Sequence, residues 1–134
     1  MTKMPAYAAV AATLTILLTT TVLAANISAV DGGTLQIDGK RLRLWGIEAP
    51  APGDICTTTK GAKWPCGNRG RDQLRAALAE GPASCVDKEP GFVLCRIAGL
   101  DIARLMIKEG LAKAGADYHD TEQQARAAKI GIWE

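Results

Sequence analysis

The stretch Val30–Ala51, "VDGGTLQIDGKRLRLWGIEAPA", contains acidic and basic residues that could do chemistry. Among them are Asp31, Arg43 and Glu48. Hydrolysis of a phosphodiester builds negative charge on the phosphoryl oxygens, so it needs a cation, guanidinium donors and a base beside the attacking water. Carboxylates can hold the cation, and an arginine can bind the phosphate. These residue types are therefore compatible with a site for a phosphate and a metal ion.

Length and charge limit the classes of protein that this chain can belong to. It has 134 residues, enough for one compact domain, and 48% of them are apolar, as in a folded core. The formal net charge is +2, and removal of residues 1–25, whose only charged residue is Lys3, would leave +1. A dedicated nucleic-acid binder carries a larger basic excess. Any contact with nucleic acid must therefore come from local clusters.

The N-terminus resembles a targeting segment. Residues 5–25 carry no charge and end in "VLAA", where small residues suit a signal peptidase. The same segment would span about 31 Å as a helix, enough to cross a bilayer core. We expect an N-terminal apolar helix over 1–25, either a cleaved signal peptide or a retained transmembrane anchor, and a folded domain over 26–134. The protein is then periplasmic or secreted, or anchored to the membrane.

Four cysteines follow this segment and none precedes it. In an exported domain an even number indicates disulfides. A Cys56–Cys66 bond would close a loop and stabilise the fold by roughly 3 kcal/mol in the chain-entropy model, and Cys85 and Cys95 would join two strands of a hairpin. Zinc is the alternative, although Cys-x-x-Cys spacing is absent and the single histidine, His119, stands in a polar stretch. We expect His119 to be solvated.

The elements that must position Arg43 begin with three short β-prone runs between Asn26 and Ile47. The turn signals "DGG" and "GK" join them, which predicts a β-meander. Alternation in the third run places Leu42 and Leu44 on one face and Arg43 on the other. Arg43 within a strand must therefore find a partner or a cavity.

The rest of the chain predicts a loop, a hairpin and three helices. In chain order these are the loop 49–67, a helix over 68–79 with Asn68 as its N-cap, a hairpin over 83–99, a helix from about 102 that Gly110 ends, and a helix over 121–129. The fold class is therefore α+β.

This order of elements, with "VDGGTLQIDGKRLRLWGIEAP", "KWPCG", "DIARLMIKEGLAKA" and the terminal "GIW", resembles the staphylococcal-nuclease-like (thermonuclease) family. The resemblance covers nearly everything after residue 26, and the loop with "WPCG" is similar to the exported proteobacterial type. It implies an OB-fold, a five-stranded Greek-key β-barrel with about three helices. It also implies a calcium-dependent phosphodiesterase that cuts DNA and RNA.

The family's metal ligands are mostly replaced. The family reads Asp-Gly-Asp-Thr after the first strand, and its second Asp, a calcium ligand, corresponds to Gly33 in "DGGT". The Asp of its "D-x-P-E" motif corresponds to Glu48, and the threonine that often follows corresponds to Ala49. Calcium takes about six to eight oxygen ligands. We therefore expect calcium to bind weakly or not at all, through Asp31 and Glu48 if it binds.

The catalytic groups of the family are replaced as well. The general base after the proline corresponds to Ala51, and the second phosphate-binding arginine corresponds to Phe92. Arg43 is the one member of the catalytic set that remains. Tyr118 matches one of the family's two base-stacking tyrosines, and the other position holds Ala116. Arg43 and Tyr118 are therefore the candidate binding residues.

These replacements favour a binding protein over an enzyme. Loss of one electrostatic donor typically lowers the rate about 10² to 10³-fold, and loss of a general base about 10² to 10⁴-fold. The main hypothesis is an exported accessory subunit that needs no cofactor and binds an unidentified protein partner, in an envelope membrane complex, in preference to nucleic acid. Arg43 would then pair with Asp31 or Glu48 inside the barrel.

In one alternative to the main hypothesis, the protein is an enzyme. In a divergent calcium-dependent nuclease, Asp31, Glu48 and Asp54 would rearrange around the ion, and Arg41 or Lys88 would replace the lost arginine. Saturable binding of calcium would separate this alternative from the main hypothesis.

The other alternative is a non-catalytic module for an oligosaccharide or an anionic ligand, since OB barrels use one face for such ligands. Arg43, Trp45, Phe92 and Tyr118 would contribute to its surface. Trp45 is otherwise expected in core or edge packing, and Trp64 in the cysteine loop is the better candidate for an exposed contact.

Overall fold

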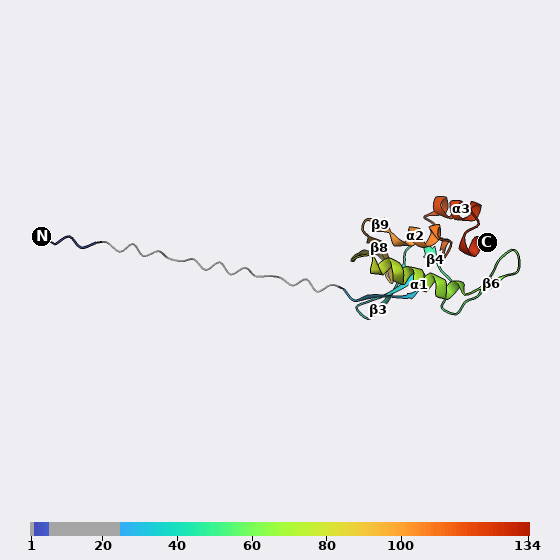
Figure 1. The fold of residues 1–134 in the computed structure, drawn as a ribbon, viewed down its shortest axis with the longest axis horizontal. Coiled ribbons are helices and arrows are strands. Elements are labelled where there is room, and N and C mark those ends of the chain that lie inside the picture. The colour runs from blue at the N-terminus through green and yellow to red at the C-terminus, as the bar shows by residue number, and fades with distance from the viewer. Residues whose placement is uncertain (1, 6–24) are drawn as a thin grey trace.

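The computed structural model describes residues 2–5 and 25–134 and shows an α+β fold. A curled mixed sheet is packed against three helices (Figure 1). In Figure 1, α1 crosses the middle of the molecule, and α2 and α3 lie together on one side of it. The loop that carries β6 extends at the end of the molecule where the C-terminus also lies.

Five of the six strands of the main sheet lie in the order β1-β2-β3-β8-β7. Their bounds are β1 Ile27–Asp31, β2 Thr34–Ile37, β3 Lys40–Leu44, β8 Phe92–Ile97 and β7 Ala83–Glu89. Neighbours are antiparallel except β3 and β8, which run parallel. The expected meander and hairpin are therefore confirmed, and the sheet curls into a half-barrel.

Short strand pairs extend this frame. They are β9 (Leu100–Asp101) on β8, β4 (Ile47–Glu48) with β10 (Lys113–Ala114), and β5 (Cys56–Thr57) with β6 (Lys63–Trp64). The β5–β6 pair lies inside the segment that the sequence predicts to be loop throughout. Two residues per strand are enough to fix Trp64 directly opposite Cys56.

Helix α1 (Cys66–Ala79) begins two residues before the expected Asn68, which is not its N-cap. The N–H of Gly67, in its first turn, donates instead to the carbonyl of Asp54 at 3.2 Å, and the side chain of Asn68 accepts from Gly53. The loop thus satisfies a helix end that a cap side chain would otherwise satisfy. Gly70 lies against Gly32. A Cβ atom added to Gly70 would come within 3.3 Å of the Cα atom of Gly32.

Helices α2 (Ile102–Lys108) and α3 (His119–Ala127) follow, and a 3₁₀ turn, η1 (Gly131–Trp133), ends the described chain. Asp101 caps α2, because its carboxylate accepts from the N–H groups of Ala103 and Arg104. The two helices lie close to their predicted positions, with Gly110 in the left-handed region after α2. Helix α3 begins two residues earlier than expected.

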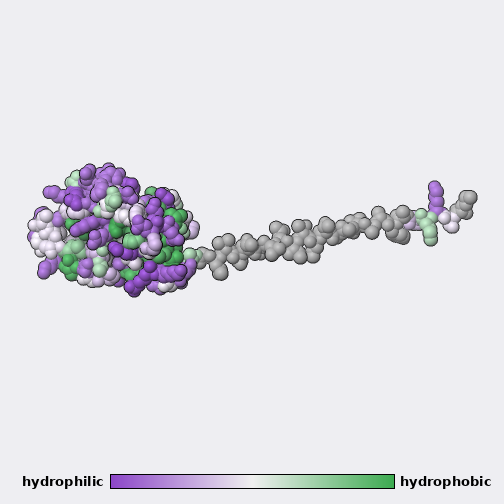
Figure 2. Space-filling model, turned by 180° about the vertical axis from the view of Figure 1, so that it is seen from behind, coloured by the Kyte–Doolittle hydropathy of each residue, from purple (hydrophilic) through white to green (hydrophobic). Residues whose placement is uncertain are grey.

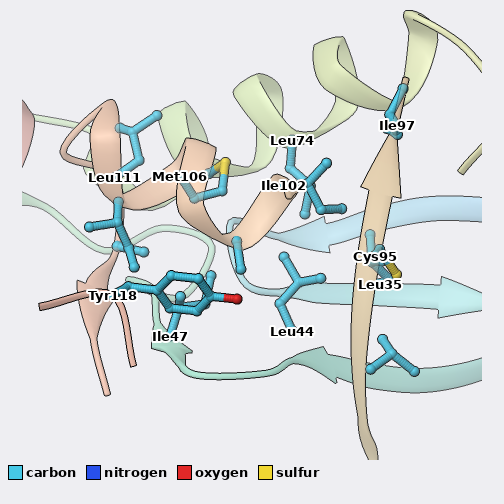
Figure 3. Packing of buried hydrophobic residues seen from close by; sticks show 14 residues of the cluster. Leu35, Leu44, Ile47, Leu74, Cys95, Ile97, Ile102, Met106, Leu111 and Tyr118 are labelled. Atoms are coloured by element: carbon cyan, nitrogen blue, oxygen red, sulfur yellow. The ribbon is translucent and has the colours of Figure 1, made fainter. Parts of the chain in front are cut away.

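The core lies between the inner face of the sheet and the helices. Figure 3 shows Leu74 of α1 and Ile102 and Met106 of α2 facing Leu35 and Leu44 of the sheet. All five side chains are at most 1% exposed. Alternation along β3 and β8 directs every second residue into this core. The intervening residues therefore form a separate outer face.

Hydrophilic residues cover most of the face shown in Figure 2, and hydrophobic residues form small groups among them. Most of the expected N-terminal helix over 1–25, with its alternatives of signal peptide and anchor, lies outside the described residues. Within the part of the chain that the structure describes, no helix has the length and apolar character needed to span a membrane.

Candidate functional site

The turn between β1 and β2 contains the position of the missing calcium ligand. Gly33 is buried there, and its N–H donates to Oδ1 of Asp31 at 2.7 Å. A Cβ atom on Gly33 would lie 3.2 Å from Cβ of Ala49 and 3.8 Å from Oδ1 of Asp31. The fold therefore brings positions 31, 33 and 49 together, but only Asp31 offers a side-chain oxygen.

Glu48 and Asp54 line a hollow of about 460 Å³ together with Lys113. Glu48 is exposed on β4, directly opposite Lys113. Oδ2 of Asp54 accepts from the N–H of Ala51 at 2.8 Å, so this carboxylate stabilises its own loop. Within residues 2–5 and 25–134, no three His, Cys, Asp or Glu side chains are arranged to hold a metal ion. In the described part of the chain, Asp31, Glu48 and Asp54 thus do not form a group of three that could hold a metal ion.

Arg43 is exposed on the outer face of β3. The β3–β8 register places it beside Phe92, and its guanidinium carbon lies 5.4 Å from the centroid of that ring, within cation–π range. Among the described residues, Arg43 has no salt-bridge partner, so the expected pairing with Asp31 or Glu48 inside the barrel is wrong. The physical reason is strand alternation, because the neighbouring Leu44 points into the core.

Two further side chains join Arg43 and Phe92. The Trp45 ring meets the Phe92 ring edge-on, with centroids 5.9 Å apart, and Nζ of Lys88 lies 5.9 Å from the Trp45 ring. Nε1–H of Trp45 donates to Oδ2 of Asp117 at 3.1 Å, which fixes the indole. We name Arg43, Trp45, Lys88 and Phe92 the Arg43 cluster. It combines two cations with two aromatic rings. The cations can bind the negative charge of an anionic ligand, and the rings can pack against a flat, apolar face of the same ligand.

Tyr118 does not belong to this surface. It is 8% exposed, and its hydroxyl donates to Oδ2 of Asp101 at 2.7 Å (Figure 3 shows the ring among core residues). Burial, and then the hydrogen bond to Asp101, raise the pKa of Tyr118 above its ordinary value. The ring packs against Gly46, where a Cβ would come within 2.8 Å of it. A buried, bonded ring has no free face for stacking, so its role in this structure is to connect α3 to α2.

Both expected disulfides are present. Cys56 bonds Cys66, and Cys85 bonds Cys95 across the β7–β8 hairpin. No described cysteine is free, and this accounts for all four in the sequence, so the zinc alternative is wrong. Two disulfides in a small domain indicate an oxidising location outside the cytoplasm. His119 is exposed at the start of α3.

The sequence analysis named the four residues of the Arg43 cluster under different hypotheses. Lys88 was a substitute arginine in a divergent nuclease, and Arg43, Trp45 and Phe92 belonged to a ligand-binding surface. Lys88 and Phe92 flank the hairpin turn, far along the chain from Arg43. Only the parallel pairing of β3 with β8 brings them together, and no local signal in the sequence specifies that pairing. Asp117, which holds Trp45, had no recognisable signal either.

Comparison with known proteins gives a distant similarity. No protein-family profile matches the chain. The succinoglycan biosynthesis protein ExoI of Rhizobium meliloti (strain 1021) is 33% identical over 118 residues, a match that covers 79% of this chain and 62% of that protein. The chain thus spans less than two thirds of the length of this relative.

Proposed function

We propose that this chain is a degenerate member of the staphylococcal-nuclease-like family and that its half-barrel is an OB-type barrel. Three observations support the proposal. The order β1-β2-β3-β8-β7 is compatible with a five-stranded, partly open Greek-key barrel. Three helices pack on it in the expected chain order. Positions 31, 33 and 49 meet at one point, as residues of a shared cation site would.

The proposed function is binding without catalysis. Gly33 and Ala51 lack the acidic groups that a nuclease of this family uses, and a phenyl ring, Phe92, stands beside Arg43 where a second arginine would bind phosphate. A phenyl ring cannot donate to a phosphate, but it can pack against the apolar face of a ring-containing ligand. The replacement therefore changes the kind of ligand that the site favours.

The proposed ligand is an acidic glycan, held by the Arg43 cluster outside the cytoplasm. The observation that carries this proposal is the contact of Arg43 with Phe92 and of Lys88 with Trp45, two cations placed on two aromatic rings. Cations bind carboxylate groups of acidic sugars, and the rings pack against sugar C–H groups. Similarity to a protein named for succinoglycan biosynthesis supports a glycan over a nucleic acid.

In the cell envelope, the domain would act as an accessory subunit that holds a glycan chain for a protein partner. Its N-terminal segment, if retained, would keep it at the membrane. Neither a cofactor nor a metal ion is needed for such a role.

The test is calorimetric titration of the full chain with a hexamer of galacturonic acid. The methyl-esterified hexamer, which has the same sugars without charge, serves as the matched ligand. The variant Arg43→Gln should weaken binding of the acidic hexamer at least about tenfold, equivalent to about 1.4 kcal/mol. Arg75→Gln, at an exposed arginine on α1, is the matched control and should bind as the wild type does. Equal affinity of both variants would refute the proposed site.

A further inference from the structure

A second hollow lies on a different part of the molecule. Its volume is about 950 Å³, at the upper end of the range for pockets that hold small organic ligands. The cysteine loop, α1, the residues after α2 and the segment 129–134 form its walls. It shares no residue with the Arg43 cluster. Figure 1 shows the cysteine loop and the C-terminus at the same end of the molecule. We name this hollow the Trp64 groove.

One wall of the Trp64 groove is an aromatic ring held in a fixed place. Trp64 lies on β6 opposite Cys56, and the bond from Cys56 to Cys66 ties this strand pair to the start of α1. The indole is partly buried against the main core, so part of it remains exposed to the groove. The ring therefore offers a flat apolar surface that does not need to be ordered on binding.

The other walls carry polar side chains of both signs. Arg69 and Gln73 are one turn apart on α1 and so share a face of the helix. Glu109 and Lys129 also line the groove. None of the three charged residues has a salt-bridge partner among the residues that the structure describes. Their donors and acceptors are therefore available to a ligand.

This combination suits an uncharged sugar chain. Every sugar hydroxyl both donates and accepts, so it can use the carboxylate of Glu109 as well as the amide of Gln73 and the guanidinium of Arg69. The lining includes three cations and two glutamates, with Lys60 and Glu134 completing the set. Such mixed charge gives a polyanion little net attraction.

We propose that the Trp64 groove binds a neutral segment of an oligosaccharide, with the sugar ring packed on Trp64 and its hydroxyls bonded to Gln73, Arg69 and Glu109. The inference rests on the proposed glycan-binding function and assigns the two sites different parts of one ligand. Acidic groups lie at the Arg43 cluster, and uncharged sugar rings lie in the groove.

The test follows the three indole N–H signals in ¹⁵N NMR spectra of the full chain, titrated with neutral hexasaccharides of glucose and of galactose. We expect at least one of them to shift the Trp64 signal in a saturable way, and Gln73→Ala to weaken this binding at least fivefold. Gln123→Ala, at an exposed glutamine of α3 outside the groove, is the matched control and should change nothing. Gln73 is a better target than Trp64, because Trp64 also packs against the core.

The results separate the two proposals. If neither neutral hexasaccharide shifts the Trp64 signal, the groove proposal is overturned, while binding of the acidic hexamer that depends on Arg43 would still support the proposed function. If only the acidic hexamer shifts the Trp64 signal, the assignment of the groove to uncharged sugar is wrong. Arg43→Gln should leave neutral binding in the groove unchanged.

Discussion

The hydrogen bond from Tyr118 to Asp101 connects the start of α3 to the cap of α2, and its removal by Tyr118→Phe has a calculable effect. Hydrogen bonds to charged groups contribute about 1.5–3 kcal/mol. Asp101 is only half-buried and keeps its bonds to Ala103 and Arg104, so water can partly replace the lost hydroxyl. We therefore expect the low end of this range, a decrease of about 1.5 kcal/mol in the free energy of unfolding at pH 7.

The pH dependence of this loss gives a sharper test. Because the pKa of Tyr118 is raised in the folded state, its contribution to stability is complete below the unfolded pKa and falls as pH rises above it. The unfolded value is about 10, and each further pH unit removes about 1.4 kcal/mol. The wild type and Tyr118→Phe should therefore reach equal stability near pH 11, on the order of one unit above that pKa.

The assay is urea unfolding of both proteins followed by circular dichroism at pH 7, 9, 10 and 11, with the disulfides intact. Ionisation of other groups is common to both proteins and cancels in the difference. A difference in stability below about 0.3 kcal/mol at pH 7, which is within ordinary additivity error, would refute the reasoning about the bond. A difference that stays constant to pH 11 would refute the reasoning about its pKa. Glycan binding should be unchanged in Tyr118→Phe, because the ring is buried.

Three further predictions concern stability. Gly67→Ala should unfold the start of α1, because the new Cβ would lie 1.8 Å from the carbonyl oxygen of Ala51; we expect a loss above about 3 kcal/mol in urea unfolding, and a wild-type midpoint would contradict it. Replacing both Cys85 and Cys95 by alanine should lower stability by about 3 kcal/mol, measured against the oxidised wild type; an unchanged melting temperature would count against a stabilising role. Burial raises the pKa of Glu122, but bonds from Ala114 and Arg126 outweigh it and leave the pKa below the ordinary 4.5. Its contribution is therefore present above that pH and lost as pH falls through the lowered pKa. The melting temperature of Glu122→Gln should be lower than that of the wild type at pH 7 and approach it in acid; a gap that stays constant as pH falls would contradict this.

Elements with strong local signals could be predicted from the sequence. Alternating residues predicted the meander, Gly110 marked the end of α2, and the cysteine spacing gave both disulfides. The predicted start of α1 was wrong. The carbonyl of Asp54, distant in sequence, accepts from the N–H of Gly67, a helix-end group that a local cap was expected to satisfy. Local rules cannot include a partner that only tertiary structure supplies.

The candidate site was predictable by residue type but not by position. Arg43 was expected inside the barrel because a charged residue in a strand needs a partner, yet the outer face exposes it to solvent beside Phe92. Tyr118 was expected on a binding surface, and the structure buries it against Gly46 and Asp101. Both differences arise from contacts between segments far apart in the chain.

The central claim, binding without catalysis, is tested most directly by incubating the full chain with single-stranded DNA and calcium. A variant that combines Gly33→Asp, Ala51→Glu and Phe92→Arg is run beside it, to ask whether the barrel can still support the chemistry. We predict no calcium-dependent cleavage by the wild type. Cleavage by the wild type that Glu48→Gln abolishes would contradict the claim and identify a rearranged nuclease.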